Sequence, residues 1–220
     1  TRVDLDLAQF KDDIWSHWMN KSSLKNIATE VINLEINALK ILKKSINKNF
    51  DKAVNTIVNC QSKIILCGVG KSGLIAAKIA STLSSVGSPA FSLSANDCLH
   101  GDLGSITKKD VLILISNSGK SEEIIPIVKF ANKNKIKLIG IVSKKNSFLY
   151  KSSNIKILLP DVKESGLGVV PTSSTSIQLA IGDALAVAAL KKKQFSRYDF
   201  SRLHPGGSLG KQLKTVGDIM

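Results

Sequence analysis

The chain has 220 residues, of which 43% are hydrophobic and 22% charged, a balance typical of a globular protein with one main domain. Its formal net charge is +14, but the lysines are dispersed and few aromatic residues accompany them, which argues against a nucleic-acid-binding surface. No apolar run approaches the roughly 18 to 20 residues of a membrane span. Residues 1–11 are too polar for a signal peptide, so we expect a cytoplasmic protein without membrane contact.

Helical patterns come first in the chain. Residues 1–22 carry no pattern that assigns them, and we treat them as an N-terminal extension. Apolar residues at helical spacing then predict a long amphipathic helix over residues 23–47. A shorter helix is expected over residues 51–61, with Asp51 as its N-cap.

Expected strands and helices alternate from residue 63 onwards. The strands are predicted at residues 64–69, 90–93, 111–116, 138–142 and 155–159. The main helices between and after them are predicted at residues 74–86, 122–134 and 173–192. This alternation indicates an α/β fold, a doubly wound parallel sheet of five strands flanked by helices. Such sheets bind ligands beyond the carboxyl ends of their strands.

A glycine-rich turn follows the first predicted strand. The segment Gly68–Gly73 reads Gly-Val-Gly-Lys-Ser-Gly and opens a helix, which favours an anion at the helix N-terminus. A dinucleotide site would need a carboxylate after the next strand, where Ser92–Ala95 offers none, and a Walker loop would need glycine at Ile65. The phosphate of a small metabolite fits better. The candidate residues of this turn are Gly70, Lys71 and Ser72.

Two hydroxyl-rich segments follow later strands and open helices. Serine and threonine hydroxyls together with helix N–H groups can hold a phosphate without a cation. N-capping alone explains one hydroxyl at each helix but not three or four in a row. We therefore favour binding over capping at the first segment, and for the second the two interpretations stay equally open. The candidates are Ser116, Asn117, Ser118, Ser121, Thr172, Ser173, Ser174 and Thr175.

The chain has three cysteines, Cys60, Cys67 and Cys98. They form no CxxC pair, and their odd number argues against a disulfide framework or a structural zinc site. The sequence predicts that they are ordinary core residues.

Six motifs occur in the order found in one known family. Together they resemble the sugar-isomerase (SIS) domain of the arabinose 5-phosphate isomerases, over residues 32–220. The motifs are Gly68–Gly73, His100-Gly-Asp-Leu-Gly104, Ile115-Ser-Asn-Ser-Gly119, Pro171-Thr-Ser-Ser-Thr175, Gly182-Asp-Ala-Leu-Ala186 and His204-Pro-Gly-Gly-Ser-Leu-Gly210.

The resemblance implies a flavodoxin-like SIS domain over residues 23–214, with residues 215–220 as the start of a CBS pair that is truncated or absent here. It also implies an aldose–ketose isomerase that interconverts D-ribulose 5-phosphate and D-arabinose 5-phosphate through a cis-enediol, and so supplies the sugar Kdo for lipopolysaccharide. The resemblance further implies a homotetramer with sites at subunit interfaces.

Four residues match the family's catalytic positions. Glu123 or Glu164 is expected to remove the carbon proton, and we favour Glu164. His204 is expected to act as the oxygen acid and base or in ring opening, and Lys71 to neutralise the enediolate. A first-turn carboxylate at Glu123 and a turn residue at His204 are the open alternatives. Substrate contacts are also expected from Gly87, Ser88 and His100.

Departures from the family pattern concern the metal and the base. Ser94 stands where family members often have a second histidine, so a zinc site is disfavoured. If zinc were bound, His100 would be a possible ligand. We expect the reaction to require no cofactor. Between Glu164 and Pro171 the chain is one residue shorter than the family pattern, so the position of Glu164 departs from that pattern.

Two rival functions remain open. One is a non-catalytic phosphosugar sensor, but residues 1–20 with one long helix are too short to supply the DNA-binding domain of a regulator. The other is an isomerase of another sugar phosphate.

Overall fold

The computed structural model describes residues 23–205. Three expectations therefore lie outside the described residues. They concern the extension over residues 1–22, the C-terminal part of the motif that begins at His204, and the start of a CBS pair over residues 215–220.

The core of the fold is a five-stranded parallel sheet with strand order β2-β1-β3-β4-β5, which confirms the doubly wound prediction. Strands β1 and β3 are buried at every position because helices cover both faces of the sheet. The chain reverses its direction of travel across the sheet between these two strands, which is where such sheets bind ligands. The strands are β1 (Ile64–Gly68), β2 (Ala90–Ser94), β3 (Val111–Ser116), β4 (Lys137–Val142) and β5 (Ile155–Leu158).

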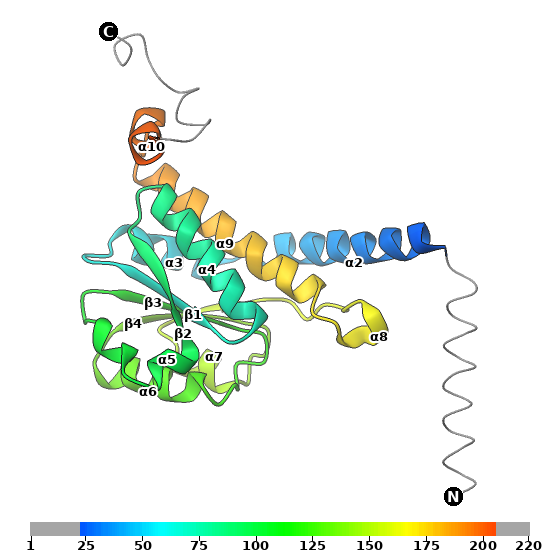
Figure 1. The fold of residues 1–220 in the computed structure, drawn as a ribbon, viewed down its shortest axis with the longest axis horizontal. Helices are drawn as coiled ribbons and strands as arrows, with labels where there is room; N and C mark the ends of the chain where they lie inside the picture. The colour runs from blue at the N-terminus through cyan, green and yellow to red at the C-terminus, as the bar shows by residue number, and fades with distance from the viewer. Residues whose placement is uncertain (1–22, 206–220) are drawn as a thin grey trace, which may run out of the picture.

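Helices form a layer on each face of the sheet (Figure 1). One layer holds the four longest helices, and its apolar residues form the larger core cluster. These are α2 (Leu24–Ser45), α3 (Lys48–Val58), α4 (Lys71–Ser85) and α9 (Ser173–Lys192). The other layer holds α5 (Ala95–Cys98), α6 (Ile124–Lys133) and α7 (Phe148–Ser152). The remaining short elements are η1 (Asp102–Ser105), α8 (Gly166–Val169) and α10 (Arg197–Leu203).

Two helices begin three residues earlier than the sequence predicts. Helix α3 begins at Lys48, because the side chain of Asn47 caps it by accepting a 2.9 Å hydrogen bond from the N–H of Asn49. Asp51 lies in the first turn of this helix instead of capping it. Helix α4 begins at Lys71, three residues earlier than predicted, so the lysine of the glycine turn is its first residue. The four- to seven-residue helices α5, α7, α8 and α10 were not predicted, because they are too short to show a helical period.

Helices α4 and α9 approach each other closely. A Cβ at Gly182 would lie 2.2 Å from the side chain of Ile79, so only glycine permits this contact. Lys78 forms an ion pair with Asp183 at the same crossing. The glycine and aspartate of the Gly-Asp-Ala-Leu-Ala motif therefore hold α4 and α9 together.

Within the described residues α9 alone is long and apolar enough to cross a membrane. Half of that stretch is buried, however, with Ile177 in the core.

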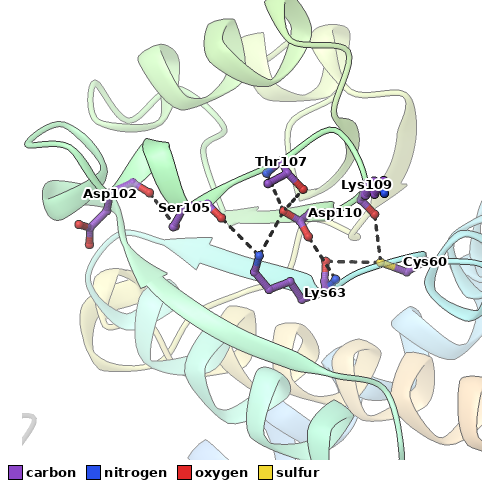
Figure 2. Close-up of polar contacts among 7 residues, drawn as sticks. All are labelled: Cys60, Lys63, Asp102, Ser105, Thr107, Lys109 and Asp110. Carbon is purple, nitrogen blue, oxygen red and sulfur yellow. Dashed lines mark hydrogen bonds and ion pairs between the residues drawn. The ribbon is translucent and has the colours of Figure 1, made fainter.

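A polar network closes the amino edge of the sheet (Figure 2). Asp110 precedes β3 and is only 1% exposed, and its carboxylate accepts hydrogen bonds from the N–H of Thr107 at 2.6 Å and of Lys63 at 3.1 Å. The Nζ of Lys63 lies 3.6 Å from the same carboxylate. Burial raises the pKa of Asp110, but the hydrogen bonds from Thr107 and Lys63 outweigh burial and leave it below its ordinary value. This network holds the starts of β1 and β3 in register.

Candidate functional site

The turn between β1 and α4 leaves open space at a helix N-terminus. Gly70 caps α4 with φ 56° and ψ −127°, a conformation that favours glycine, and no atom lies within 4 Å of the position a Cβ would occupy. Lys71, which comes next, is exposed. A Cβ at Gly73 would lie 2.8 Å from the carbonyl oxygen of Gly68, so the turn is tightly folded on itself. The turn therefore offers helix N–H groups and a lysine to an anion.

The loop after β3 forms a second compact turn at the same edge of the sheet. The hydroxyl of Ser116 accepts a 3.0 Å hydrogen bond from the N–H of Gly119, and the hydroxyl of Ser118 accepts one of 3.3 Å from Lys120. Gly119 has φ 63°, and a Cβ there would lie 2.4 Å from the hydroxyl of Ser147. Asn117 and Ser118 remain exposed at the tip of the loop, followed by half-buried Ser121. These residues flank the switch point between β1 and β3.

Glu164 caps the N-terminus of α9. Its Oε2 accepts hydrogen bonds from the N–H groups of Thr172 at 2.9 Å and Ser174 at 3.2 Å, and from the Thr172 hydroxyl at 3.3 Å. Burial raises the pKa of Glu164, but the hydrogen bonds from Ser174 and Thr172 outweigh burial and lower it below its usual value. Glu164 is therefore ionised at neutral pH and already occupies the anion position at this helix.

One hydrogen bond joins the glycine turn to the Glu164 segment. The hydroxyl of Ser72 donates a 3.1 Å hydrogen bond to Oε1 of Gln178, which is buried in α9 one turn beyond Ser174. Gln178 is not among the residues that the sequence predicts for the site. The signal that could have found it was a polar side chain on the buried stripe of an otherwise apolar helix, four residues after Ser174. Lys71 and Glu164 are thus held at one end of the α4–α9 pair.

Three buried hydroxyls lie near these segments. Ser143, Ser165 and Ser173 have no hydrogen-bond partner within residues 23–205. Ser143 follows β4, Ser165 adjoins Glu164 and Ser173 begins α9, so all three lie beyond the carboxyl ends of strands. Buried hydroxyls are almost always paired in folded proteins. These three hydroxyls are therefore exceptions among the described residues.

A hollow of about 590 Å³ lies beside Glu164. Apolar residues of α2, including Ile27, Val31 and Leu34, line one side, and residues 163–172 contribute to the other. A hollow of this size matches the range typical of small-molecule sites. Figure 1 shows the α8 segment beside α2, away from the body of the sheet.

Two other candidates, Glu123 and His100, lie at the carboxyl edge of the sheet, and within residues 23–205 no side-chain hydrogen bond joins either of them to Lys71 or Glu164. Glu123 is half-buried at the start of α6, after β3. His100 is exposed after α5 and β2, and its N–H donates to the carbonyl oxygen of Asp97 at 2.9 Å. Within residues 23–205 no three histidine, cysteine or acidic side chains come together as metal ligands.

Three other candidates lie apart from Lys71 and Glu164. They are Gly87, Ser88 and His204. The Gly87 carbonyl and the Ser88 hydroxyl each accept a 2.9 Å hydrogen bond from Lys193, just after α9, so both serve to join β2 to the far end of that helix. His204 ends α10, with its ring stacked 3.9 Å from that of Phe200. Helix α9 has 20 residues, which spans about 30 Å. Figure 1 shows α10 and α8 at opposite ends of α9. Within one chain these three residues therefore lie apart from Lys71 and Glu164.

Comparison with known proteins gives a family match and close relatives. The model of the SIS domain matches residues 57–188. Arabinose 5-phosphate isomerase KdsD of Francisella tularensis is 46% identical over 192 residues, which cover 86% of this chain and 59% of that protein. An uncharacterized protein of Rickettsia prowazekii is 37% identical over 202 residues, covering 92% of this chain and 63% of that protein. The chain thus spans about three fifths of the length of these relatives.

A solved structure of an E. coli CFT073 protein in complex with arabinose 5-phosphate is also similar. Its TM-score is 0.80 and its sequence is 36% identical, with 83% of this chain and 97% of that chain covered. The likeness therefore extends over most of this chain.

Proposed function

Because the chain belongs to the SIS-domain family, we propose that it is an aldose–ketose isomerase that interconverts D-ribulose 5-phosphate and D-arabinose 5-phosphate. The observation that carries the proposal is the hydrogen-bonded connection of the Lys71 turn to the Glu164 segment through Ser72 and Gln178. It places a cation and a carboxylate at one edge of the sheet. The name of the Francisella tularensis relative and the arabinose 5-phosphate complex of the E. coli CFT073 protein support this choice of substrate.

The phosphate is proposed to bind at the switch point. Glu164 already accepts the N–H groups at the start of α9, and a phosphate dianion there would be repelled by the carboxylate. The turn after β1 and the Ser116–Ser121 loop carry no such carboxylate in their contacts and flank the same crevice. Thr172, Ser173, Ser174 and Thr175 are then proposed to hold the sugar end of the substrate and the base.

The proposed chemistry uses Glu164 as the carbon base. In the forward direction it removes a proton from C1 of the ketose, and the resulting cis-enediolate is protonated at C2 while a proton moves between the two oxygens. Lys71 stabilises the negative charge on the enediolate oxygen. Hydrogen bonds lower the pKa of Glu164 and so weaken it as a base, and a phosphate dianion bound nearby would oppose that shift. Glu164 is preferred to Glu123 because its contacts lead to the Lys71 turn.

His204 is proposed to act in the site of another copy. Within one chain α9 separates it from the Lys71 turn, so an oxygen acid and base at His204 requires sites at subunit interfaces. Apolar side chains of α2 are exposed, among them Leu24 at 84% and Ile32 at 57%, and a second copy would bury them. The proposed assembly is a homotetramer.

The reaction transfers only protons, so we propose that it needs no cofactor and no zinc, with Lys71 in place of a Lewis acid. The arabinose 5-phosphate would supply the synthesis of Kdo and lipopolysaccharide, and the proposed location is the cytoplasm.

The test is turnover of the chelator-treated chain with D-ribulose 5-phosphate, followed by phosphorus NMR. We expect an arabinose 5-phosphate resonance to grow, and to be lost with Lys71→Ala. Restoration only after zinc is added would overturn the metal-free mechanism. Binding of the sugar phosphate without turnover, with or without zinc, would favour the sensor function, and turnover of a hexose or heptose phosphate alone would assign a different substrate.

A further inference from the structure

Lys193 is the C-cap of α9, and its ammonium group binds two uncharged oxygens. Its Nζ donates a 2.9 Å hydrogen bond to the carbonyl oxygen of Gly87 and another of 2.9 Å to the hydroxyl of Ser88. Ser88 is 0% exposed, and the turn that contains it leads into β2. Lys193 therefore ties the end of α9 to the sheet.

The chain leaves α9 against the same turn. Gly87 has φ 80°, and a Cβ at this position would overlap the ring of Phe195. The N–H of Phe195 donates a 3.1 Å hydrogen bond to the carbonyl oxygen of Leu190, and Gln194 just before it has a left-handed φ of 55°. Lys193, Phe195 and the turn at residues 87–88 thus set the direction in which the chain continues, and we call them the α9–α10 joint.

Helix α10 starts directly after this joint, and residues 194–196 link it to Lys193. The hydroxyl of Ser196 accepts a 3.1 Å hydrogen bond from the N–H of Asp199, and the Asp199 carboxylate accepts one of 2.9 Å from the N–H of Ser196. Figure 1 shows α10 beyond the end of α9, apart from the sheet. His204 is the C-cap of α10, so its position depends on how the α9–α10 joint directs the helix.

The ring of His204 is held in one tautomer. Its Nδ1 lies 2.8 Å from the carbonyl oxygen of Phe200, and its ring stacks on that of Phe200 with an angle of 15° between the planes. A carbonyl oxygen only accepts hydrogen bonds, so Nδ1 must carry a proton. In the neutral ring Nε2 is then the nitrogen without a proton, and it is the atom that can take up a proton and release it.

We propose that Lys193 is a positioning residue, which directs α10 so that Nε2 of His204 moves a proton between the two substrate oxygens. This role rests on the proposed isomerase function. Nε2 takes the proton from the oxygen on C1, so that one O–H bond breaks and one N–H bond forms. The imidazolium then gives this proton to the oxygen on C2 and is neutral again, while Glu164 carries the carbon proton. No oxidant or further reactant is consumed.

Nitrogen NMR of the full chain tests the tautomer without substrate. The chain has three histidines, His17, His100 and His204, so labelling histidine with ¹⁵N gives few ring signals. The variant His204→Ala identifies the signals of His204. In the neutral ring we expect the proton on Nδ1 and none on Nε2. A neutral ring protonated on Nε2 would overturn the assignment of the reacting atom.

Hydrogen exchange tests the α9–α10 joint, again without substrate. Lys193→Met keeps the apolar part of the side chain and removes its donors, whereas Lys193→Arg keeps a cation with donors. Lys192→Met is the matched control, because Lys192 is exposed one residue earlier. Exchange of the α10 amides should become about tenfold faster in Lys193→Met and stay near the wild-type rate in the other two variants. Equal rates in all four chains would overturn the role of the joint.

Turnover tests the consequence for the reaction. Lys193→Met should lower kcat by about tenfold, because His204 is misplaced, and should leave KM near its wild-type value. Lys193→Arg should regain most of the lost kcat, and Lys192→Met should retain the wild-type kcat. An unchanged kcat in Lys193→Met would overturn the positioning role.

Deuterium uptake separates this role from a merely structural one. In D₂O, D-ribulose 5-phosphate gains deuterium at C1 whenever the enediolate returns to the ketose after its proton has exchanged on Glu164. Isomerisation needs the transfer between oxygens and this return does not, so Lys193→Met should slow isomerisation about tenfold more than deuterium uptake. Equal slowing of both would overturn the action through His204. If the wild-type chain shows neither process, the isomerase proposal fails, whereas the NMR and hydrogen-exchange measurements still decide the tautomer and the joint.

Discussion

The hydroxyl of Ser72 donates a 3.1 Å hydrogen bond to Oε1 of Gln178, 106 residues later in the chain. Ser72 belongs to the first turn of α4, beside Lys71, and Gln178 to the second turn of α9, beyond the segment capped by Glu164. This bond therefore connects the cation and the carboxylate of the candidate site. Substitutions at Ser72 and Gln178 can therefore test the site without removing a charge.

Loss of the Ser72–Gln178 bond should weaken both stability and turnover. In Gln178→Leu, we expect the free energy of unfolding to fall by about 1 kcal/mol, the usual net value of one hydrogen bond. A urea double-mutant cycle with Ser72→Ala should give a coupling energy of similar size. Turnover should fall by about tenfold, because Lys71 is no longer held against α9. Additive effects of the two substitutions on stability would mean that the bond contributes nothing.

Glu164 and Glu123 can be separated by matched substitutions to glutamine. Glu164→Gln should lower turnover by about a hundredfold or more, as loss of a general base does. It should also lower the free energy of unfolding by about 1 kcal/mol, because a charge at the N-terminus of α9 is lost. Glu123→Gln should change turnover by much less, since none of its contacts lead to Lys71. The reverse ranking in a turnover assay would transfer the role of carbon base to Glu123.

Mixing inactive variants should restore activity if His204 serves another copy. Lys71→Ala and His204→Ala chains are each expected to be inactive. After they are unfolded together and refolded, a hybrid pair contains one intact site, so about a quarter of the native activity should return with random pairing. Refolding each variant alone is the control. Activity that stays at the control value in the mixture would show that His204 does not act in the site of another copy.

Acid should destabilise the protein through Asp110. Its folded pKa lies below the ordinary value, so its stabilising effect is complete above the unfolded pKa of about 3.9 and is lost as pH falls through the folded pKa. At pH 7, Asp110→Asn should lower the free energy of unfolding by about 1 to 3 kcal/mol, because the Lys63 and Thr107 donors lose a charged acceptor.

The difference between wild type and Asp110→Asn should shrink steadily in urea titrations as the pH falls below about 4. Asp161→Asn is a suitable control, since Asp161 pairs with Lys144 at the surface and exposed pairs contribute about 0 to 1 kcal/mol. A difference that persists at low pH would show that the Asp110 charge is not the cause.

The sequence by itself determined the sheet and the position of the candidate site along the chain. Apolar runs bounded by glycine and polar residues located all five strands, with β3 correct at both ends, because burial on two faces demands continuous apolar residues. Parallel strands place their following loops at one edge. For that reason the segments at Lys71, Ser116 and Thr172 could be predicted to share an edge before any contact was known.

Only the tertiary structure decided which of these residues meet. The Ser72–Gln178 bond joins positions 106 residues apart in sequence, and no local pattern around either residue predicts the other as its partner. The separation of His204 from Lys71 depends on the length and direction of α9 across the sheet. Local patterns report which face of an element is buried, whereas pairing between elements depends on how helices pack on the sheet.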